Sequence, residues 1–144
     1  MLAVFAAVLA LAGAPANTPV ACVPALTHVN LGQAAWVDGR LARIELSPQV
    51  CLAARFAAAD REERSRIALA HHRAMYEVLG VGMLALLHEA EHVALQSRNE
   101  CQVEKAAYAK VPILLRQFGP RLFRQTMASA KDYHDHLPAS YRDC

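Results

Sequence analysis

Residues 81–96 read VGMLALLHEAEHVALQ, and this stretch decides the fold. Its first seven residues are apolar on every side of a helix, which predicts that this helix is buried. His88, Glu89 and His92 follow directly. A buried charge needs a partner, so the abrupt change from apolar to charged residues is unusual. Because a bound metal ion would supply that partner, the sequence predicts a buried, metal-binding helix over about residues 81–96.

The segment His88 to His92, HEAEH, matches the pattern HExxH. Two histidines at positions i and i+4 lie on one face of a helix, close enough to bind one metal ion. Glu89 follows the first histidine and can deprotonate a metal-bound water, so it is the predicted general base. Such a short match also arises by chance, and the plain alternative is a helix face in solvent. The apolar run before the motif argues against this alternative.

Two glutamates follow the motif at a useful spacing. Two histidines leave a catalytic zinc site short of one protein ligand. Asn99 can cap the next helix, so Glu100 lies in its first turn and can face the histidines as the third ligand. Glu104, one turn later on the same face, can accept a hydrogen bond from a ring N–H of His88 or His92. An exchange of these two roles stays open, as does the plain alternative of a helix-capping charge and a surface ion pair.

The first 16 residues, MLAVFAAVLALAGAPA, are apolar and uncharged, and end in a small-x-small sequence. They are expected to be a signal peptide, because a membrane span needs about 20 apolar residues. A retained membrane anchor is the alternative, since no Lys or Arg precedes the apolar run. After cleavage we expect no stable membrane insertion, and a secreted or cell-envelope location. The formal net charge of +2 and the spread of basic residues exclude a nucleic-acid partner on this reasoning.

The four cysteines lie after residue 16. An even number in an exported chain indicates two disulfides, for which three pairings are possible. We favour Cys22–Cys51 and Cys101–Cys144, which tie the N-terminal strand to the first helix and the C-terminal tail to the metal-site region. The absence of CxxC spacing disfavours a thiolate metal site.

Residues 17–144 are expected to form one domain. Strands are predicted over residues 20–26, 34–37 and 41–46, with a hairpin at Asp38-Gly39. Helices are predicted over residues 48–58, 60–79, 81–96, 100–118 and 121–136, with an interruption at Gly80 and Gly82 and a kink or break at Pro112. The fold class is therefore α+β, mainly α: a short N-terminal antiparallel hairpin or sheet followed by about four to five helices.

HEAEH followed by NECQVE resembles the gluzincin metallopeptidases, in which HExxH precedes a glutamate ligand and then an acidic residue one turn later. Most of residues 40–144 is also similar to small exported actinobacterial proteins of uncharacterised function. The shared features are, in chain order, Ile44-Glu45-Leu46, Cys51, the HExxH motif, Glu100 with Glu104, and the tail LPASYRDC of residues 137–144. In those proteins a cysteine commonly follows the second glutamate, whereas here Cys101 follows the first. The resemblance implies a minimal zincin-like core.

The resemblance also implies a zinc-dependent hydrolase that cleaves peptide bonds of a peptide or protein substrate. Zn²⁺ is held by His88, His92 and Glu100 and lowers the pKa of its water towards about 7. Glu89 takes the proton from that water and passes it to the leaving amine.

The oxyanion of such a reaction needs a second electrophile besides the metal. The candidates are Tyr108, Tyr133, His134 and His136, all after the metal motifs. The segment Ile44-Glu45-Leu46 is expected to pair with extended substrate, as the edge strand of gluzincins does.

A non-catalytic exported module that keeps its metal for structure is the alternative function, because the sequence reveals no substrate pocket or lid. A di-iron bundle, a third hypothesis, needs Glu-x-x-His on two helices. Only Glu89 to His92 has that spacing, so this hypothesis is set aside.

Overall fold

The computed structural model describes residues 1–26, 30–71 and 75–144. Within these ranges the chain forms a three-stranded sheet and seven helices. In chain order the elements are α1 (Leu2–Ala12), β1 (Val20–Cys22), β2 (Gly32–Val37), β3 (Arg40–Leu46), α2 (Pro48–Ala58), α3 (Arg61–His71), α4 (Met75–Leu95), α5 (Glu100–Arg116), α6 (Pro120–Asp135) and α7 (Ala139–Arg142). The predicted α+β, mainly α class is confirmed. The additional helices are α1, in the predicted leader, and α7, in the tail.

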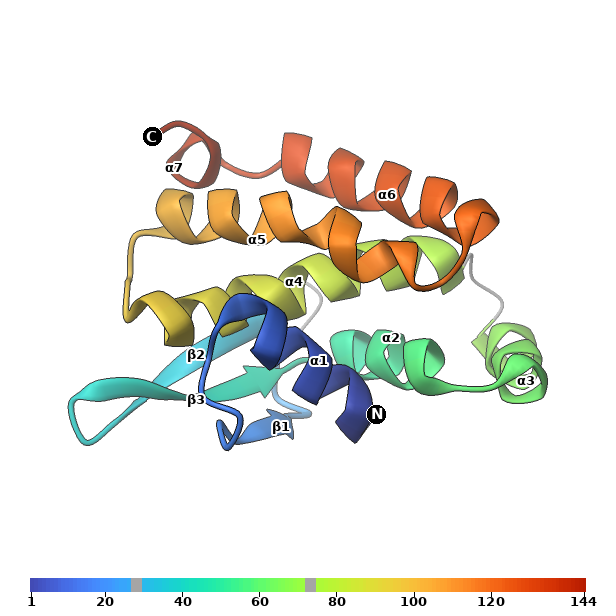
Figure 1. Cartoon of the computed structure of the whole chain (residues 1–144), viewed down its shortest axis with the longest axis horizontal. Helices are drawn as coiled ribbons and strands as arrows, with labels where there is room; N and C mark the ends of the chain where they lie inside the picture. Colours follow the sequence, from blue (N-terminus) through green and yellow to red (C-terminus); the bar gives the residue numbers. More distant parts are fainter. Residues whose placement is uncertain (27–29, 72–74) are drawn as a thin grey trace.

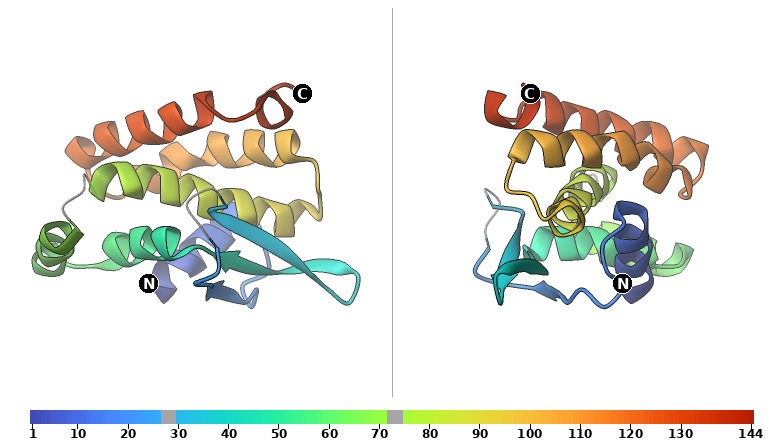
Figure 2. Two further views of the ribbon diagram at one scale, coloured as in Figure 1. Left: turned by 180° about the vertical axis from the view of Figure 1, so that it is seen from behind. Right: turned by 60° about the vertical axis from the view of Figure 1, so that its left-hand side comes forward.

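Helix α4 lies at the centre of the molecule. It runs between a layer formed by α5 and α6 and a layer formed by α2 and the sheet (Figures 1 and 2). By length and composition α4 is apolar enough to cross a membrane, but 83% of its apolar window is buried inside the protein. The predicted buried helix is therefore confirmed, and its hydropathy is accounted for by its position in the core.

The predicted break at Gly80 and Gly82 is wrong. The sequence predicts one helix from residue 60 to 79, whereas the structure has α3 and α4, which run in different directions (Figure 2). Part of that prediction, residues 72–74, lies outside the described residues. Both glycines lie inside α4, where a Cβ on Gly80 would come 2.1 Å from the Thr126 carbonyl oxygen and one on Gly82 would come 2.4 Å from Ala53 Cβ. The glycines thus permit close helix packing and do not end a helix.

The sheet has the strand order β1-β3-β2. Strands β2 and β3 are antiparallel and form the predicted hairpin, with positive φ at Asp38 and Gly39. Strand β1 pairs in parallel with β3, and α1 precedes the whole sheet, so the prediction of an N-terminal antiparallel sheet is wrong in these two respects. Because Ile44 and Leu46 pair on both sides, their strand is central, and the predicted edge position of this segment is also wrong.

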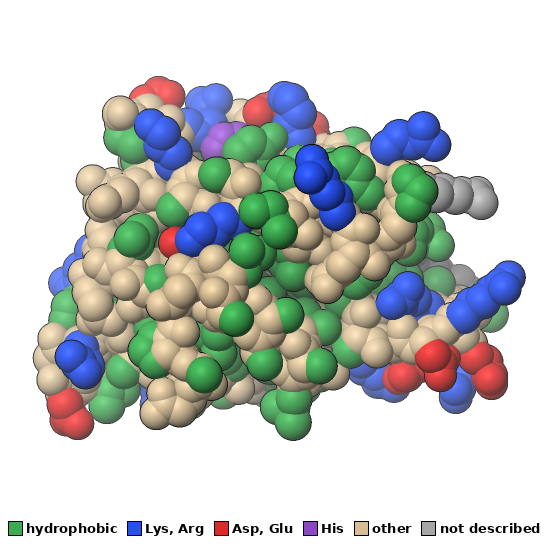
Figure 3. Space-filling view, viewed as in Figure 1, with side chains coloured by type: hydrophobic (Ala, Val, Ile, Leu, Met, Phe, Trp, Pro, Cys, Tyr) green, Lys and Arg blue, Asp and Glu red, His purple; other side chains and the backbone are tan. Residues whose placement is uncertain are grey.

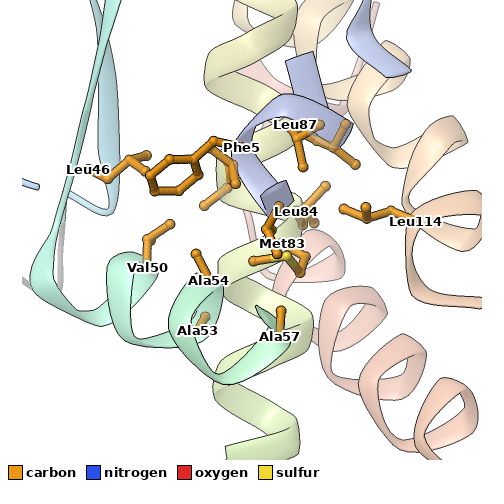
Figure 4. Close-up of a cluster of buried hydrophobic side chains, with 14 of the residues drawn as sticks. Phe5, Leu46, Val50, Ala53, Ala54, Ala57, Met83, Leu84, Leu87 and Leu114 are labelled. Atoms are coloured by element: carbon orange, nitrogen blue, oxygen red, sulfur yellow. The ribbon is translucent and has the colours of Figure 1, made fainter. Parts of the chain in front are cut away.

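Six helices, α1 to α6, and the sheet contribute side chains to one hydrophobic core. Figure 4 shows side chains from α1, β3, α2, α4 and α5 converging, among them Phe5, Leu46, Val50 and Leu84. Small side chains of α2, such as Ala54, allow that helix to lie close to α4. Helix α1 of the expected leader is part of this core, and cleavage after residue 16 stays a prediction.

The connection between α4 and α5 joins the hairpin to the central helix. Gln96 follows α4 with a φ of 50°, the left-handed conformation that ends many helices. Its side chain accepts a hydrogen bond from the Leu41 N–H (3.0 Å) and donates one to the Leu41 carbonyl (2.7 Å). Asn99 caps α5 as predicted, by accepting a hydrogen bond from the Gln102 N–H at 3.0 Å. Helix α5 continues through Pro112, which therefore does not end it.

Both favoured disulfides are formed. Cys22–Cys51 joins β1 to α2, and Cys101–Cys144 joins the first turn of α5 to the end of the chain. Disulfides persist in oxidising compartments, so these two are compatible with an extracellular environment. On the face shown in Figure 3, acidic and basic side chains are interspersed around the rim.

Candidate metal centre

The structure brings His88, His92 and Glu100 together. The two Nε2 atoms lie 3.1 Å apart, and a carboxylate oxygen of Glu100 lies 3.0 Å from that of His88 and 3.3 Å from that of His92. Both histidines project from the end of α4, and Glu100 from the first turn of α5. This group can hold a metal ion, as predicted.

The size of the triangle fits a metal site. A tetrahedral ion with ligand bonds of about 2.0–2.1 Å separates its ligand atoms by roughly 3.3 Å. The observed separations of 3.0, 3.1 and 3.3 Å are close to this value. An ion just above the plane of the three atoms would contact all of them with only small shifts of the side chains.

Each histidine ring is oriented from its other nitrogen. His92 Nδ1 lies 2.7 Å from the Ser97 carbonyl oxygen, and His88 Nδ1 lies 2.8 Å from a carboxylate oxygen of Glu104. Both partners accept hydrogen bonds, so each Nδ1 carries a proton and each Nε2 is left to face the triangle. Hydrogen bonds of this kind commonly orient metal-binding histidines and increase their basicity.

Without a cation the triangle would be electrostatically unfavourable. Two imidazole lone pairs and a carboxylate oxygen would meet with nothing between them. Burial by itself lowers the pKa of His88, but its hydrogen bonds to Glu100 and Glu104 raise that pKa to about 9. The hydrogen bond to His88 in turn lowers the pKa of Glu100. In the metal-free protein a proton on His88 thus supplies the positive charge that a divalent ion could supply instead.

Glu89 lies between this triangle and the sheet. Its carboxylate accepts a hydrogen bond from the Ala34 N–H of β2. Gly32 leaves room for it, because a Cβ there would come 2.8 Å from Glu89 Cγ. Burial raises the pKa of Glu89 to about 7, although the nearby charge of His88 opposes the shift. A buried carboxyl group that titrates near neutral pH suits the role of a general base.

Tyr141 completes the site from the C-terminal tail. Its ring stacks on that of His88, with 5.7 Å between centroids, and its hydroxyl donates a hydrogen bond to Glu100. Tyr141 was not among the site residues predicted from the sequence. The signal was present, because the favoured Cys101–Cys144 disulfide joins the residue after Glu100 to a cysteine three positions beyond Tyr141.

Three of the predicted supporting residues, Glu104, His134 and Tyr108, form one cluster next to His88. Glu104 is 2% exposed, and its second carboxylate oxygen lies 2.8 Å from His134 Nδ1, so it links the two histidines His88 and His134. Tyr108 stacks on His134 at a centroid distance of 4.0 Å. These residues stand behind His88 and leave Glu100 as the carboxylate that meets the Nε2 atoms.

Among the oxyanion candidates, Tyr133 lines a cleft that also contains His88, Glu89 and Tyr141. His136, in contrast, hydrogen-bonds to the Asp132 carbonyl on the surface of α6. Tyr108 and His134 are absent from the described lining of that cleft.

A cleft extends on both sides of His88, Glu89 and Tyr141. We call its two parts the apolar half and the Arg98 half. The apolar half has a volume of about 320 Å³ and is lined mainly by Leu31, Leu84, Ala85, Tyr133, Leu137 and Pro138. The Arg98 half has a volume of about 370 Å³ and is lined by His92, Glu100, Arg98, Trp36 and residues 32–34 of β2, among others. A wider hollow between α4 and α6 contains none of the three ligand residues.

Strand β2 presents its open edge to this cleft. It is an outer strand of the sheet, and the Ala34 N–H points away from β3 towards Glu89. The edge position next to the metal-binding helix, which was predicted for Ile44–Leu46, is therefore occupied by β2.

Comparison of the chain with models of protein families, with curated proteins and with solved structures finds no match. The resemblance to gluzincins stays a prediction, and the geometry of the site is the observation from which a function can be inferred.

Proposed function

We propose that the protein is a zinc-dependent hydrolase of peptide bonds. The observation that carries the proposal is the triangle of His88, His92 and Glu100, which leaves the buried carboxyl of Glu89 beside it. Zinc is the proposed ion because imidazole and carboxylate ligands suit it and tetrahedral coordination matches the triangle. Three protein ligands, as in known catalytic zinc sites, leave a fourth position for water or substrate.

The proposed catalytic roles of zinc and Glu89 follow from the positions of the side chains. Bound zinc would polarise the substrate carbonyl and lower the pKa of its water to about 7. Glu89 would take a proton from the attacking water as the new C–O bond forms. It would return the proton to the leaving amine as the C–N bond breaks, giving a carboxylate and an amine.

Tyr141 is the proposed donor to the developing oxyanion. Its hydroxyl hydrogen-bonds to Glu100, and its ring lies against His88, so it directly contacts two of the three proposed ligands. The hydroxyl has a single proton, so it would move its hydrogen bond from Glu100 to the oxygen on which negative charge develops. Tyr133, on the same side of the cleft as Glu104, is the competing candidate.

An extended peptide is the proposed substrate. The outer edge of β2 runs along the cleft. Its Ala34 N–H is bonded to Glu89, so a peptide would pair with the other main-chain groups of this edge, and such pairing accepts many sequences. The apolar half of the cleft is suited to a hydrophobic side chain next to the cleaved bond.

The test compares two substitutions on the same helix. Bound zinc and hydrolysis of a broad peptide pool are measured for the unsubstituted protein, for Glu89→Gln and for Glu91→Gln. Glu91 is a matched control because it lies in the same motif but pairs with Lys110 on another face of α4. We expect stoichiometric zinc in all three proteins. Hydrolysis should fall about 10²- to 10⁴-fold in Glu89→Gln alone.

Two other outcomes would contradict the proposal. Stoichiometric zinc without hydrolysis in the unsubstituted protein would favour a non-catalytic metal-binding module. No stoichiometric metal after equilibration with zinc would remove the site itself.

A further inference from the structure

Arg98 and Trp36 form a contact in the Arg98 half of the cleft. The guanidinium carbon of Arg98 lies 4.3 Å from the ring centroid of Trp36. Arg98 lies in the connection between α4 and α5, and Trp36 lies in the hairpin, so two separate segments build this contact. Trp36 is 44% exposed, which leaves a large aromatic ring accessible to a ligand.

The charge of Arg98 is not neutralised within the described part of the chain. The other arginines that form ion pairs there, Arg43, Arg55 and Arg66, each contact a glutamate. Arg98 takes part in none of the ion pairs of the described residues. A guanidinium that rests on an aromatic face keeps its N–H edge free for a planar carboxylate.

With a divalent ion at the triangle, the balance of charge in this half of the cleft would favour an anion. Its lining includes two carboxylates, Glu89 and Glu100, and among the described lining residues Arg98 is the one Lys or Arg. A divalent ion at the triangle would offset the two carboxylates when both are ionised. The charge of Arg98 would then make the net charge of this half positive.

Arg98 is also close to the proposed site of reaction. It precedes Glu100 by two residues, so their Cα atoms are at most about 7 Å apart, a distance that about two residues of extended peptide span. The apolar half contains no Lys or Arg among its described lining residues. A negative charge on a bound peptide would therefore be recognised on one side of the reacting bond only.

We propose that Arg98, supported by Trp36, forms a subsite that binds a carboxylate of the substrate. The carboxylate belongs either to an acidic side chain within about two residues of the cleaved bond or to the C-terminus of the peptide. This inference rests on the proposed function for the nature of its ligand. It adds a preference for acidic peptides, or for the ends of chains, to a cleft whose strand edge is otherwise tolerant of sequence.

Peptide binding tests this subsite without relying on turnover. Trp36 is the single tryptophan of the chain, so its fluorescence reports on this half of the cleft. The zinc-equilibrated Glu89→Gln protein is titrated with a blocked alanine peptide amide, with the same peptide containing one glutamate, and with the same peptide ending in a free carboxylate. We expect at least one carboxylate peptide to bind about tenfold more tightly than the neutral amide, because charge-assisted hydrogen bonds are strong. The two carboxylate peptides distinguish a side chain from a chain terminus.

Substitutions of arginine then assign the effect. Arg98→Gln should abolish the tenfold preference, and Arg98→Lys should retain part of it, because the lysine keeps the charge but lacks the planar donor pair. Arg66→Gln is the matched control, since Arg66 lies on α3 and is 70% exposed. The Arg66→Gln protein should keep the tenfold preference for the carboxylate peptide.

Equal binding of the three peptides, no binding of any of them, or a preference that survives Arg98→Gln would overturn the subsite. The proposed hydrolysis is decided separately by the Glu89→Gln and Glu91→Gln comparison. A functional peptidase without carboxylate preference contradicts the subsite alone, and an inactive protein that still binds acidic peptides through Arg98 contradicts the proposed reaction alone.

Discussion

Two faces of α4 each bury a glutamate, and the two glutamates differ in whether a lysine neutralises their charge. Glu91 is 1% exposed and forms an ion pair with Lys110 at 2.6 Å, next to the end of α1. Glu89 is 7% exposed and forms no ion pair with a Lys or Arg in the described part of the chain. Burial instead raises its pKa to about 7. We call these the Lys110 face and the metal face of α4.

The difference indicates that a buried glutamate paired with a lysine is structural, whereas one without such a partner is suited to a functional site. On the Lys110 face the chain supplies the opposite charge itself, so the pair contributes to the fold and needs no ligand. On the metal face three potential ligand atoms converge, and no Lys or Arg of the described residues forms an ion pair with Glu89 or Glu100. A group left in this state is suited to a ligand or a reaction.

The largest expected effect is on metal binding. His92→Ala should weaken zinc binding by about 10³-fold or more, because it removes one of three protein ligands. Glu91→Gln should leave zinc affinity within about twofold, because the Lys110 face does not contact the triangle. Competition with a fluorescent zinc chelator measures both. Equal loss in the two variants would mean that the two faces are not independent.

Stability should show the opposite pattern. Glu91→Gln should lower the free energy of unfolding by about 2–3 kcal/mol, because it leaves the Lys110 ammonium without its buried partner. Glu89→Gln should not lower the free energy of unfolding of the metal-free protein, since it replaces a carboxyl group that burial disfavours in its charged form. Urea denaturation of the metal-free proteins provides the values. A greater loss of stability in Glu89→Gln would contradict the distinction between the two faces.

The pH dependence of the metal-free protein tests the metal face by itself. The pKa of His88 is raised to about 9 in the folded protein, above its value of 6.5 in the unfolded chain. Its contribution to stability is therefore complete below about pH 6.5 and is lost as the pH rises through about 9. The expected loss from His88 alone between pH 6 and pH 9 is about 3 kcal/mol, and ionisation of Glu89 near pH 7 acts in the same direction.

The control for this prediction is His88→Gln, which should have a flatter stability profile over the same pH range. Glu91→Gln should keep the slope of the unsubstituted protein. An unchanged slope in His88→Gln would show that the titrating group lies elsewhere.

The smallest effect concerns the tail. Tyr141→Phe should reduce kcat about tenfold, or about 1.4 kcal/mol, with little change in bound zinc, because it removes one donor to the oxyanion. Tyr76→Phe, on the part of α4 away from the triangle, should have no effect. If Tyr133→Phe reduces kcat and Tyr141→Phe does not, the donor is Tyr133. The readout is steady-state hydrolysis at saturating peptide concentration.

The parts of the site that the sequence predicts depend on local spacing. His88 and His92 are related by one helical turn, and the short connection to the Asn99 cap places Glu100 beside them. The cysteine pairing was predicted from the positions of the elements and is formed as favoured. Local geometry therefore carries most of the information about this triangle.

The features that were missed depend on contacts between distant segments. Gly80 and Gly82 look like a helix break until Thr126 and Ala53 are packed against them. The parallel pairing of β1 moves Ile44 to the middle of the sheet, and no local pattern specifies that pairing. Arg98 and Trp36 meet only after the hairpin folds against the end of α4.

The proposed function requires that zinc binds at the triangle of His88, His92 and Glu100. Crystals of the protein equilibrated with zinc, measured on both sides of the zinc absorption edge, would locate the ion by its anomalous signal. We predict one zinc bound by Nε2 of His88, Nε2 of His92 and a carboxylate oxygen of Glu100, at about 2.0–2.2 Å from each. A zinc ion bound elsewhere, or none at this triangle after equilibration, would contradict the proposed metal site.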